Sequence, residues 1–108
     1  MAIVISDHSD LMNFFAGRLH NMWPEEYGTW ENAIHDICQK KSVSYLTTVQ
    51  DKLKKVIESK YDEDSLADIV NEKFSANIYP PGMDLTYQKW LEIVNEMVSE
   101  WIQKKETH

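Results

Sequence analysis

The chain is poor in cysteine, glycine, proline and arginine. Its single cysteine, Cys38, excludes an intramolecular disulfide. With three glycines and three prolines in 108 residues, it contains no repeat, no low-complexity segment and no alternating strand runs joined by Asn-Gly or Asp-Gly turns. No apolar run approaches the length of about 18 residues that indicates a membrane span. These absences favour a helical globular chain.

The residues that are present suit one folded domain over residues 1–108. Hydrophobic residues make up 43% and charged residues 27% of the chain, which is typical of a soluble globular protein. Four Trp, five Tyr and three Phe can build a compact core. A chain of this length can bury about two-thirds of its unfolded surface and fold without disulfides or metals.

The charge of the chain is strongly acidic. Eighteen acids against eleven bases give a formal charge of −7, and Arg18 is the only arginine. Such a chain repels phosphate backbones and anionic membranes, so we expect no direct nucleic-acid binding and no membrane binding. It attracts a basic partner and speeds encounter with it. Solubility alone is the alternative explanation of the charge.

The N-terminal segment does not read as a signal peptide, because it lacks a charged region followed by a long apolar region. We therefore expect a cytoplasmic protein. The short apolar segment Met1–Ser6 is expected to form a strand or a tail. Cys38 lies in a helical apolar pattern, and we expect it to be a small buried residue.

Apolar residues recur at helical spacing, which predicts an all-α fold, a single compact bundle of about five helices. The expected helices cover roughly Ser9–Met22, Trp30–Gln39, Val43–Ser59, Asp64 or Ser65 to Phe74, and Thr86–Lys104. Pro24 predicts the end of the first helix and a loop over residues 23–28, because the residue before proline avoids the helical region. Thr29 is the expected N-cap of the second helix.

The segment Ile78–Leu91 has the clearest local signals. Pro80–Gly82 predicts a break with a turn at positive φ on Gly82. Thr86 is the expected N-cap of the last helix, and Leu85 and Trp90 stand at the two positions of a hydrophobic staple. The apolar stripe of that helix comprises Tyr87, Trp90, Leu91, Val94, Met97, Val98 and Trp101.

Charge is unevenly distributed along the chain. Residues 40–60 carry six lysines against two acids, whereas residues 62–72 carry five acids and no base. Two rows of acids follow the i, i+4, i+8 spacing of a helix face: Asp64, Asp68 and Glu72, and Glu92, Glu96 and Glu100. A helix N-terminus favours acids at residues 62–64 but does not explain the rest. We expect both rows to contribute to a partner surface, with a solvated face as the alternative.

No residue pattern indicates an active site. The four histidines are scattered without i, i+4 pairing, and there is no Cys-x-x-Cys, phosphate loop or nucleophile elbow. We therefore expect no enzyme activity, no cofactor and no metal. The alternative is a small enzyme with a site assembled from His20, His35 and Glu25 or Glu26.

Two stretches together resemble a known family. The first is Leu11-Met-Asn-Phe-Phe-Ala-Gly-Arg-Leu-His20, followed by Trp23-Pro-Glu-Glu-Tyr-Gly-Thr-Trp-Glu-Asn-Ala-Ile34. The second is Tyr79-Pro-Pro-Gly-Met-Asp-Leu-Thr-Tyr-Gln-Lys-Trp-Leu91. In order and spacing they resemble the CdiI-type immunity proteins of bacterial contact-dependent growth inhibition (CDI) systems, over roughly residues 11–102.

The resemblance implies a small helical protein that binds the C-terminal toxin domain of a cognate CdiA effector and neutralises it inside the producing cell. It implies that the toxin is often an RNase, including RNases that attack transfer RNA. It also implies that the shared motif residues determine the fold rather than contact the toxin. These residues are His20, Trp23, Tyr27, Gly28, Tyr79, Trp90 and Leu91.

Charge and resemblance lead to the same expectation. An RNase needs a basic groove for its substrate, and an acidic protein can cover that groove. Tyrosines in expected loops (Tyr27, Tyr61 and Tyr79) are candidates for contacts that slow release. The expected toxin-binding residues are Asp64, Asp68, Glu72, Glu92, Glu96, Glu100 and Tyr61. The alternative is an acidic adaptor for a basic cytoplasmic partner, and a host factor bound through the toxin is left open.

Overall fold

The computed structural model describes residues 9–20 and 22–106, and every regular element in these ranges is helical. The elements are α1 (Ser9–Ala16), α2 (Trp23–Tyr27), α3 (Trp30–Lys40), α4 (Val43–Glu58), α5 (Glu63–Asp68), the π-helical turn η2 (Ile69–Lys73), the 3-10 turn η3 (Pro80–Met83) and α6 (Tyr87–Glu106). This arrangement confirms the all-α prediction. The segment Met1–Ser6, expected as a strand or a tail, lies outside the described residues.

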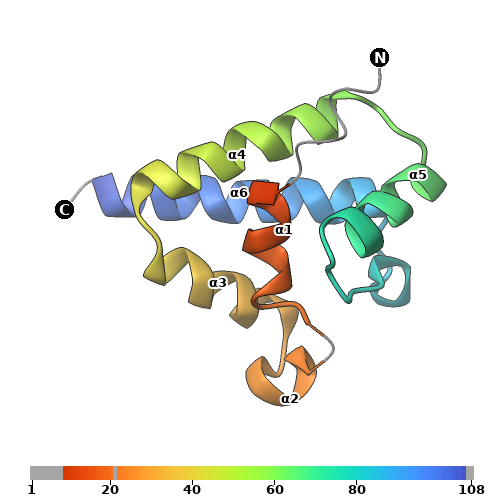
Figure 1. Cartoon of the computed structure of the whole chain (residues 1–108), viewed down its shortest axis with the longest axis horizontal. Coiled ribbons are helices and arrows are strands. Elements are labelled where there is room, and N and C mark those ends of the chain that lie inside the picture. The colour runs from red at the N-terminus through yellow and green to blue at the C-terminus, as the bar shows by residue number, and fades with distance from the viewer. Residues whose placement is uncertain (1–8, 21, 107–108) are drawn as a thin grey trace.

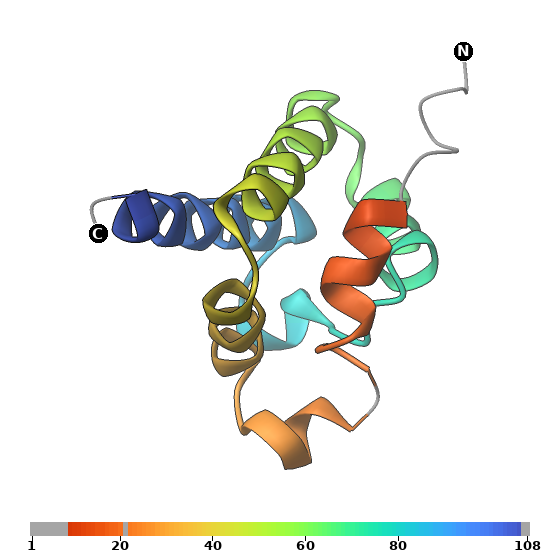
Figure 2. The ribbon, with the colours of Figure 1, turned by 60° about the vertical axis from the view of Figure 1, so that its left-hand side comes forward.

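The two longest helices, α4 and α6, pack against each other at the centre of the bundle (Figure 1). α1 packs on α4, α3 packs on α6, and α5 also contacts α6. α2 lies at the edge farthest from α4 in both Figure 1 and Figure 2. Because α6 runs along the longest dimension of the molecule, its two ends lie at opposite ends of the domain (Figure 1).

A cluster of aromatic rings joins the elements around Trp90, which is fully buried. The ring of Phe15 in α1 lies 5.5 Å from Trp90 and 5.5 Å from Phe74, and the ring of Trp30 in α3 lies 5.7 Å from Trp90. Aromatic pairs at such separations add to the free energy gained from burial. Four segments distant in sequence therefore share one core.

The predictions for the middle helices are confirmed to within one residue at their ends. The Thr29 side chain accepts a hydrogen bond from the Asn32 N–H at 3.2 Å, as expected for the N-cap of α3. The Ser42 hydroxyl caps α4 in the same way, through the Tyr45 N–H at 3.1 Å. Cys38 on α3 is fully buried, as expected.

The predicted first helix, Ser9–Met22, is wrong at its end. α1 stops at Ala16, because Gly17 favours a helix end and the N–H groups of Arg18 and Leu19 both bond the Phe15 carbonyl, which closes the last turn. The predicted loop over residues 23–28 is also wrong, because it contains α2. Pro24 occupies the first turn of α2, where a missing N–H costs nothing.

The predicted fourth helix is two elements rather than one. Asp62 caps α5 through the Ser65 N–H at 2.8 Å, so the helix begins at Glu63. From Ile69 the chain follows a π-helical turn that closes with a bond from the Phe74 N–H to the Ile69 carbonyl at 2.9 Å. Because the π turn is wider than an α-helical turn, its residues do not face the directions that α-helical spacing predicts.

The turn before α6 differs from the prediction. Gly82 does not have positive φ; it lies in η3, and the left-handed residue is Asp84, at φ 61°. Asp tolerates this conformation because its short polar side chain can bond locally. The absence of a side chain at Gly82 leaves room for the Tyr79 ring, since a Cβ there would lie 3.2 Å from that ring.

Candidate functional site

The six acids of the two rows are all exposed in the structure. Within residues 9–20 and 22–106, none of them forms an ion pair with a basic side chain. An exposed carboxylate that is not paired with a base is available to a basic ligand. The row Asp64, Asp68 and Glu72 does not keep its predicted α-helical alignment, however, because Glu72 lies within the π-helical turn.

One groove brings part of the predicted site together. It lies where the end of α4, the following loop, the start of α5 and the start of α6 meet, and we call it the acidic groove. Its lining residues are Ile57, Glu58, Lys60, Tyr61, Asp62, Glu63, Gln88 and Glu92. Tyr61 and Glu92 were predicted for the site, whereas Glu58, Asp62 and Glu63 were missed as contact candidates. The run of acids at residues 62–64 could have indicated these contacts. It was instead attributed to the preference of a helix N-terminus for acidic residues.

The walls of the acidic groove are held together by hydrogen bonds. The Gln88 amide donates to the Ile57 carbonyl at 3.2 Å and to the Glu92 carboxylate at 3.1 Å. The Glu63 carboxylate accepts from the backbone N–H of Gln88 at 3.1 Å. The half-buried Tyr61 ring contributes an aromatic surface beside these carboxylates. A lysine or arginine side chain suits this combination of carboxylates and a ring.

Glu96 and Glu100 lead away from this groove. They follow Glu92 along α6, and Glu100 lies about 12 Å from it along the helix axis. Asp64, Asp68 and Glu72 are also outside the groove lining. The predicted residues therefore form a strip along α6 and a separate group on α5 and η2, which approach each other only near the acidic groove.

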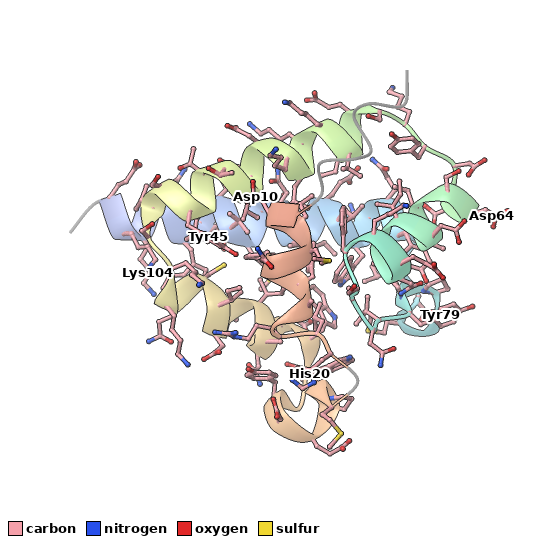
Figure 3. The ribbon with its side chains drawn as sticks, in the orientation of Figure 1. Asp10, His20, Tyr45, Asp64, Tyr79 and Lys104 are labelled. Carbon is pink, nitrogen blue, oxygen red and sulfur yellow. The ribbon has the colours of Figure 1, made fainter. Side chains whose placement is uncertain are left out.

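Several lysines lie on aromatic rings at the opposite end of the molecule. Figure 3 places Asp64 and Lys104 at opposite ends of the long dimension. At the Lys104 end, Lys104 and Lys105 lie over the Trp101 ring, at 4.8 and 5.7 Å from its centre, and Lys41 lies 5.0 Å from the centre of the Tyr45 ring. Lysines are also present at the acidic end, since Lys60 lines the acidic groove.

A second groove lies between the connection from α1 to α2 and the segment that follows η2. We call it the loop groove. Its lining includes Ala16, His20, Trp23, Pro24, Asn71 and residues 75–79. Tyr79 at its rim is 67% exposed, so this motif residue makes little contribution to the core. Trp90 and Leu91 of the same motif are fully buried.

His20 and His35, the two histidines in the described residues, do not assemble into one site. The His20 Nδ1 accepts from the Met22 N–H at 3.0 Å, so its Nε2 carries the hydrogen that it donates to Glu26 at 3.1 Å. His35 instead accepts from the Trp101 indole N–H at 2.9 Å. Among the described residues, no group of three or more His, Cys, Asp or Glu side chains could hold a metal ion. No described helix has both the length and the apolar character to cross a membrane.

The chain was compared with protein families, curated proteins and solved structures. The family model described as CdiI immunity protein matches residues 8–98, which is most of the chain. The comparisons with curated proteins and with solved structures gave no match. The chain therefore belongs to the CdiI family of immunity proteins, which are non-enzymatic inhibitors that neutralise a cognate CdiA toxin.

Proposed function

We propose that this immunity protein neutralises, in the cytoplasm, a CdiA C-terminal domain that is a basic nuclease, and that it does so through its acidic surface. A nuclease must hold a polyanionic substrate, so its active-site groove carries positive charge. An RNase, including one that attacks transfer RNA, meets this requirement. An acidic protein that covers such a groove competes with the substrate for the same charges.

One observation carries the proposal: acids gather at one end of the molecule, where Glu58, Asp62, Glu63 and Glu92 line the acidic groove against one base, Lys60. The acidic end holds the α5 acids and the acidic groove, with no base between Asp62 and Glu72. A local cluster of acids orients an approaching basic protein and raises the rate of association. Charge that only keeps a chain soluble would not need to be clustered.

The proposed contact residues have two roles. The carboxylates of Asp64, Asp68, Glu72, Glu92, Glu96 and Glu100 attract and orient the toxin. Tyr61 supplies an aromatic contact inside the acidic groove and slows release, because buried aromatic contacts contribute heavily to interface free energy. Association rate and dissociation rate therefore report on different residues.

The test is to reverse the charge of Asp64, Asp68 and Glu72 to lysine and to measure binding of the purified toxin domain over a range of salt concentrations. The association rate constant is expected to fall about tenfold or more at low salt, with a weaker salt dependence. The matched control reverses three exposed acids elsewhere, Glu31, Asp51 and Glu106, which changes the net charge equally. Equal effects of both triple variants would contradict a localised binding surface.

The nuclease assignment needs a separate assay. The toxin domain alone is expected to degrade RNA, with transfer RNA as the first substrate to try, and one equivalent of the immunity protein should abolish the cleavage. A toxin domain that binds this chain tightly but cleaves no nucleic acid would refute the nuclease assignment and leave the family function intact.

A further inference from the structure

The loop groove has walls that are fixed by hydrogen bonds between distant segments. The Trp23 indole N–H donates to the Asn77 carbonyl at 2.6 Å, and the Asn77 N–H donates to the Leu19 carbonyl at 2.7 Å. These two bonds tie the connection from α1 to α2 onto the segment after η2. A bound ligand would therefore meet a surface that needs little ordering.

Asn71 fixes the other side of the same segment. Its amide donates to the carbonyls of Ala76 and Ile78, at 2.9 and 3.0 Å, and its side-chain oxygen accepts from the Tyr87 hydroxyl at 3.0 Å. Tyr87 is buried, so this network anchors the rim of the groove to α6. Tyr79 follows directly after the anchored residues.

Tyr79 is the most exposed of the large hydrophobic side chains in the described residues. Its ring lies against Gly82, where even a methyl group would come within 3.2 Å of it. The ring is thus held over a turn rather than packed into the core. An aromatic side chain on a rigid rim beside a groove has the character of an interface anchor, because little entropy is lost when a partner covers it.

The charges around the loop groove favour a basic occupant. Residues 16–28 and 71–84 carry four acids against two bases, and one of those bases, Arg18, is bonded to Asp36. Two acids border the lining: Glu72 follows Asn71 in the sequence, and Glu26 accepts a hydrogen bond from His20 at 3.1 Å. Tyr79 and Asp64 lie at the same end of the molecule (Figure 3). The Tyr79 rim of the loop groove therefore lies at the end that carries the α5 acids.

We propose that Tyr79 and the loop groove form a second contact surface for the toxin domain, on which a lysine or arginine side chain of the toxin lies against the Tyr79 ring. A cation over a tyrosine face is stabilised by the ring quadrupole, and Glu26 and Glu72 at the border of the groove supply negative charge. This inference rests on the proposed function, because both place the toxin at the acidic end. It assigns to Tyr79 a role in binding rather than in folding.

The test measures association and dissociation rates of the purified cognate toxin domain with three variants, Tyr79→Ala, Tyr79→Phe and Tyr79→Leu. Tyr79→Ala and Tyr79→Leu are expected to dissociate about tenfold faster or more, with the association rate changed by less than about threefold. Tyr79→Phe keeps the ring and should dissociate like the unsubstituted chain. Tyr45→Ala, at the opposite end, is the matched control and should leave both rates unchanged.

Several outcomes would overturn the inference. Unchanged dissociation in Tyr79→Ala, with thermal stability also unchanged, would remove Tyr79 from the interface. Slow dissociation in Tyr79→Leu together with fast dissociation in Tyr79→Ala would mean that an apolar side chain of the toxin, and not a basic one, contacts residue 79. This result would refute the proposed basic occupant. If the Asp64, Asp68 and Glu72 reversals slow association while Tyr79→Ala has no effect, the inference fails and the acidic surface stands. If the reversals have no effect but Tyr79→Ala releases the toxin, the acidic-surface proposal fails instead.

Discussion

Glu63 and Tyr87 are joined by a hydrogen bond in which the Glu63 carboxylate accepts from the Tyr87 backbone N–H at 2.7 Å. The other carboxylate oxygen accepts from the Gln88 N–H at 3.1 Å, and the Thr86 hydroxyl accepts from the Lys89 N–H at 3.0 Å. The first three N–H groups of α6 therefore have acceptors. Only Thr86 lies beside them in sequence; Glu63 reaches them from the start of α5 and fixes α5 against α6.

Replacing Glu63 should weaken the fold. Glu63→Ala is expected to lower the free energy of unfolding by about 1–2 kcal/mol, because two helix N–H groups lose their acceptor and the helix dipole loses a negative charge. Glu63→Gln should have a smaller effect, since it keeps one acceptor oxygen. Asp64→Ala, which removes an exposed neighbouring acid, is the control in urea denaturation. A loss in Asp64→Ala as large as in Glu63→Ala would contradict the capping role.

The hydroxyl of Tyr87 should stabilise the segment that follows η2. Tyr87→Phe is expected to cost about 1 kcal/mol, because the Asn71 side-chain oxygen loses its donor. Amide hydrogen exchange should become faster in residues 76–78, which the Asn71 amide holds. Tyr45→Phe, at the other end of α4 and α6, is the comparison. Unchanged exchange in Tyr87→Phe would mean that Asn71 does not depend on Tyr87.

Stability should depend on the ionisation of Asp36. The hydrogen bond from Lys40, followed by the bond from Arg18, holds the pKa of Asp36 below its ordinary value of 3.8, against the opposing effect of burial. Because the folded-state pKa is lowered, ionised Asp36 stabilises the fold above pH 3.8, and this contribution is lost as the pH falls through the folded-state value.

The measurement compares Asp36→Asn with the unsubstituted chain by urea denaturation at a series of pH values. The difference in free energy of unfolding is expected to be largest above about pH 5 and to shrink as the pH falls below the ordinary aspartate value. A difference that stays constant over this whole interval would show that the two basic partners do not stabilise the ionised carboxylate.

The thiol of Cys38 should be unreactive in the folded protein. Burial raises its pKa to about 12, with Lys105 acting weakly in the opposite direction, and the side chain has no exposed surface. Since the thiolate is the reactive species, a disulfide reagent at mild alkaline pH is expected to label Cys38 only after unfolding. Rapid labelling without denaturant would indicate that α3 opens readily.

Local sequence signals correctly predicted the helix caps and the buried face of α6. Thr29 and Thr86 were identified as N-caps because capping depends on residues within one helical turn. The apolar stripe of α6 placed Trp90 and Leu91 in the core for the same reason, since helical spacing fixes which residues share a face. The family resemblance rested on the order of such segments, and the family match confirms it.

The predictions that failed had ambiguous or weak local signals, or depended on contacts between distant segments. Pro24 was taken only as a helix end, although a proline also fits the first turn of a helix such as α2. The π turn at Ile69 and the left-handed Asp84 have no local sequence signal of comparable strength. The acidic groove arises only because the end of α4 and the starts of α5 and α6 meet in space.

The sequence by itself determined the helical class, the caps, the core face of α6 and the excess of acids, because each depends on residue type and short-range spacing. Only the tertiary structure decided which acids lie together, that Glu63 caps α6, and that Tyr79 is exposed beside a groove. These features depend on packing between residues far apart in the chain, and helical periodicity does not encode which faces of separate helices meet.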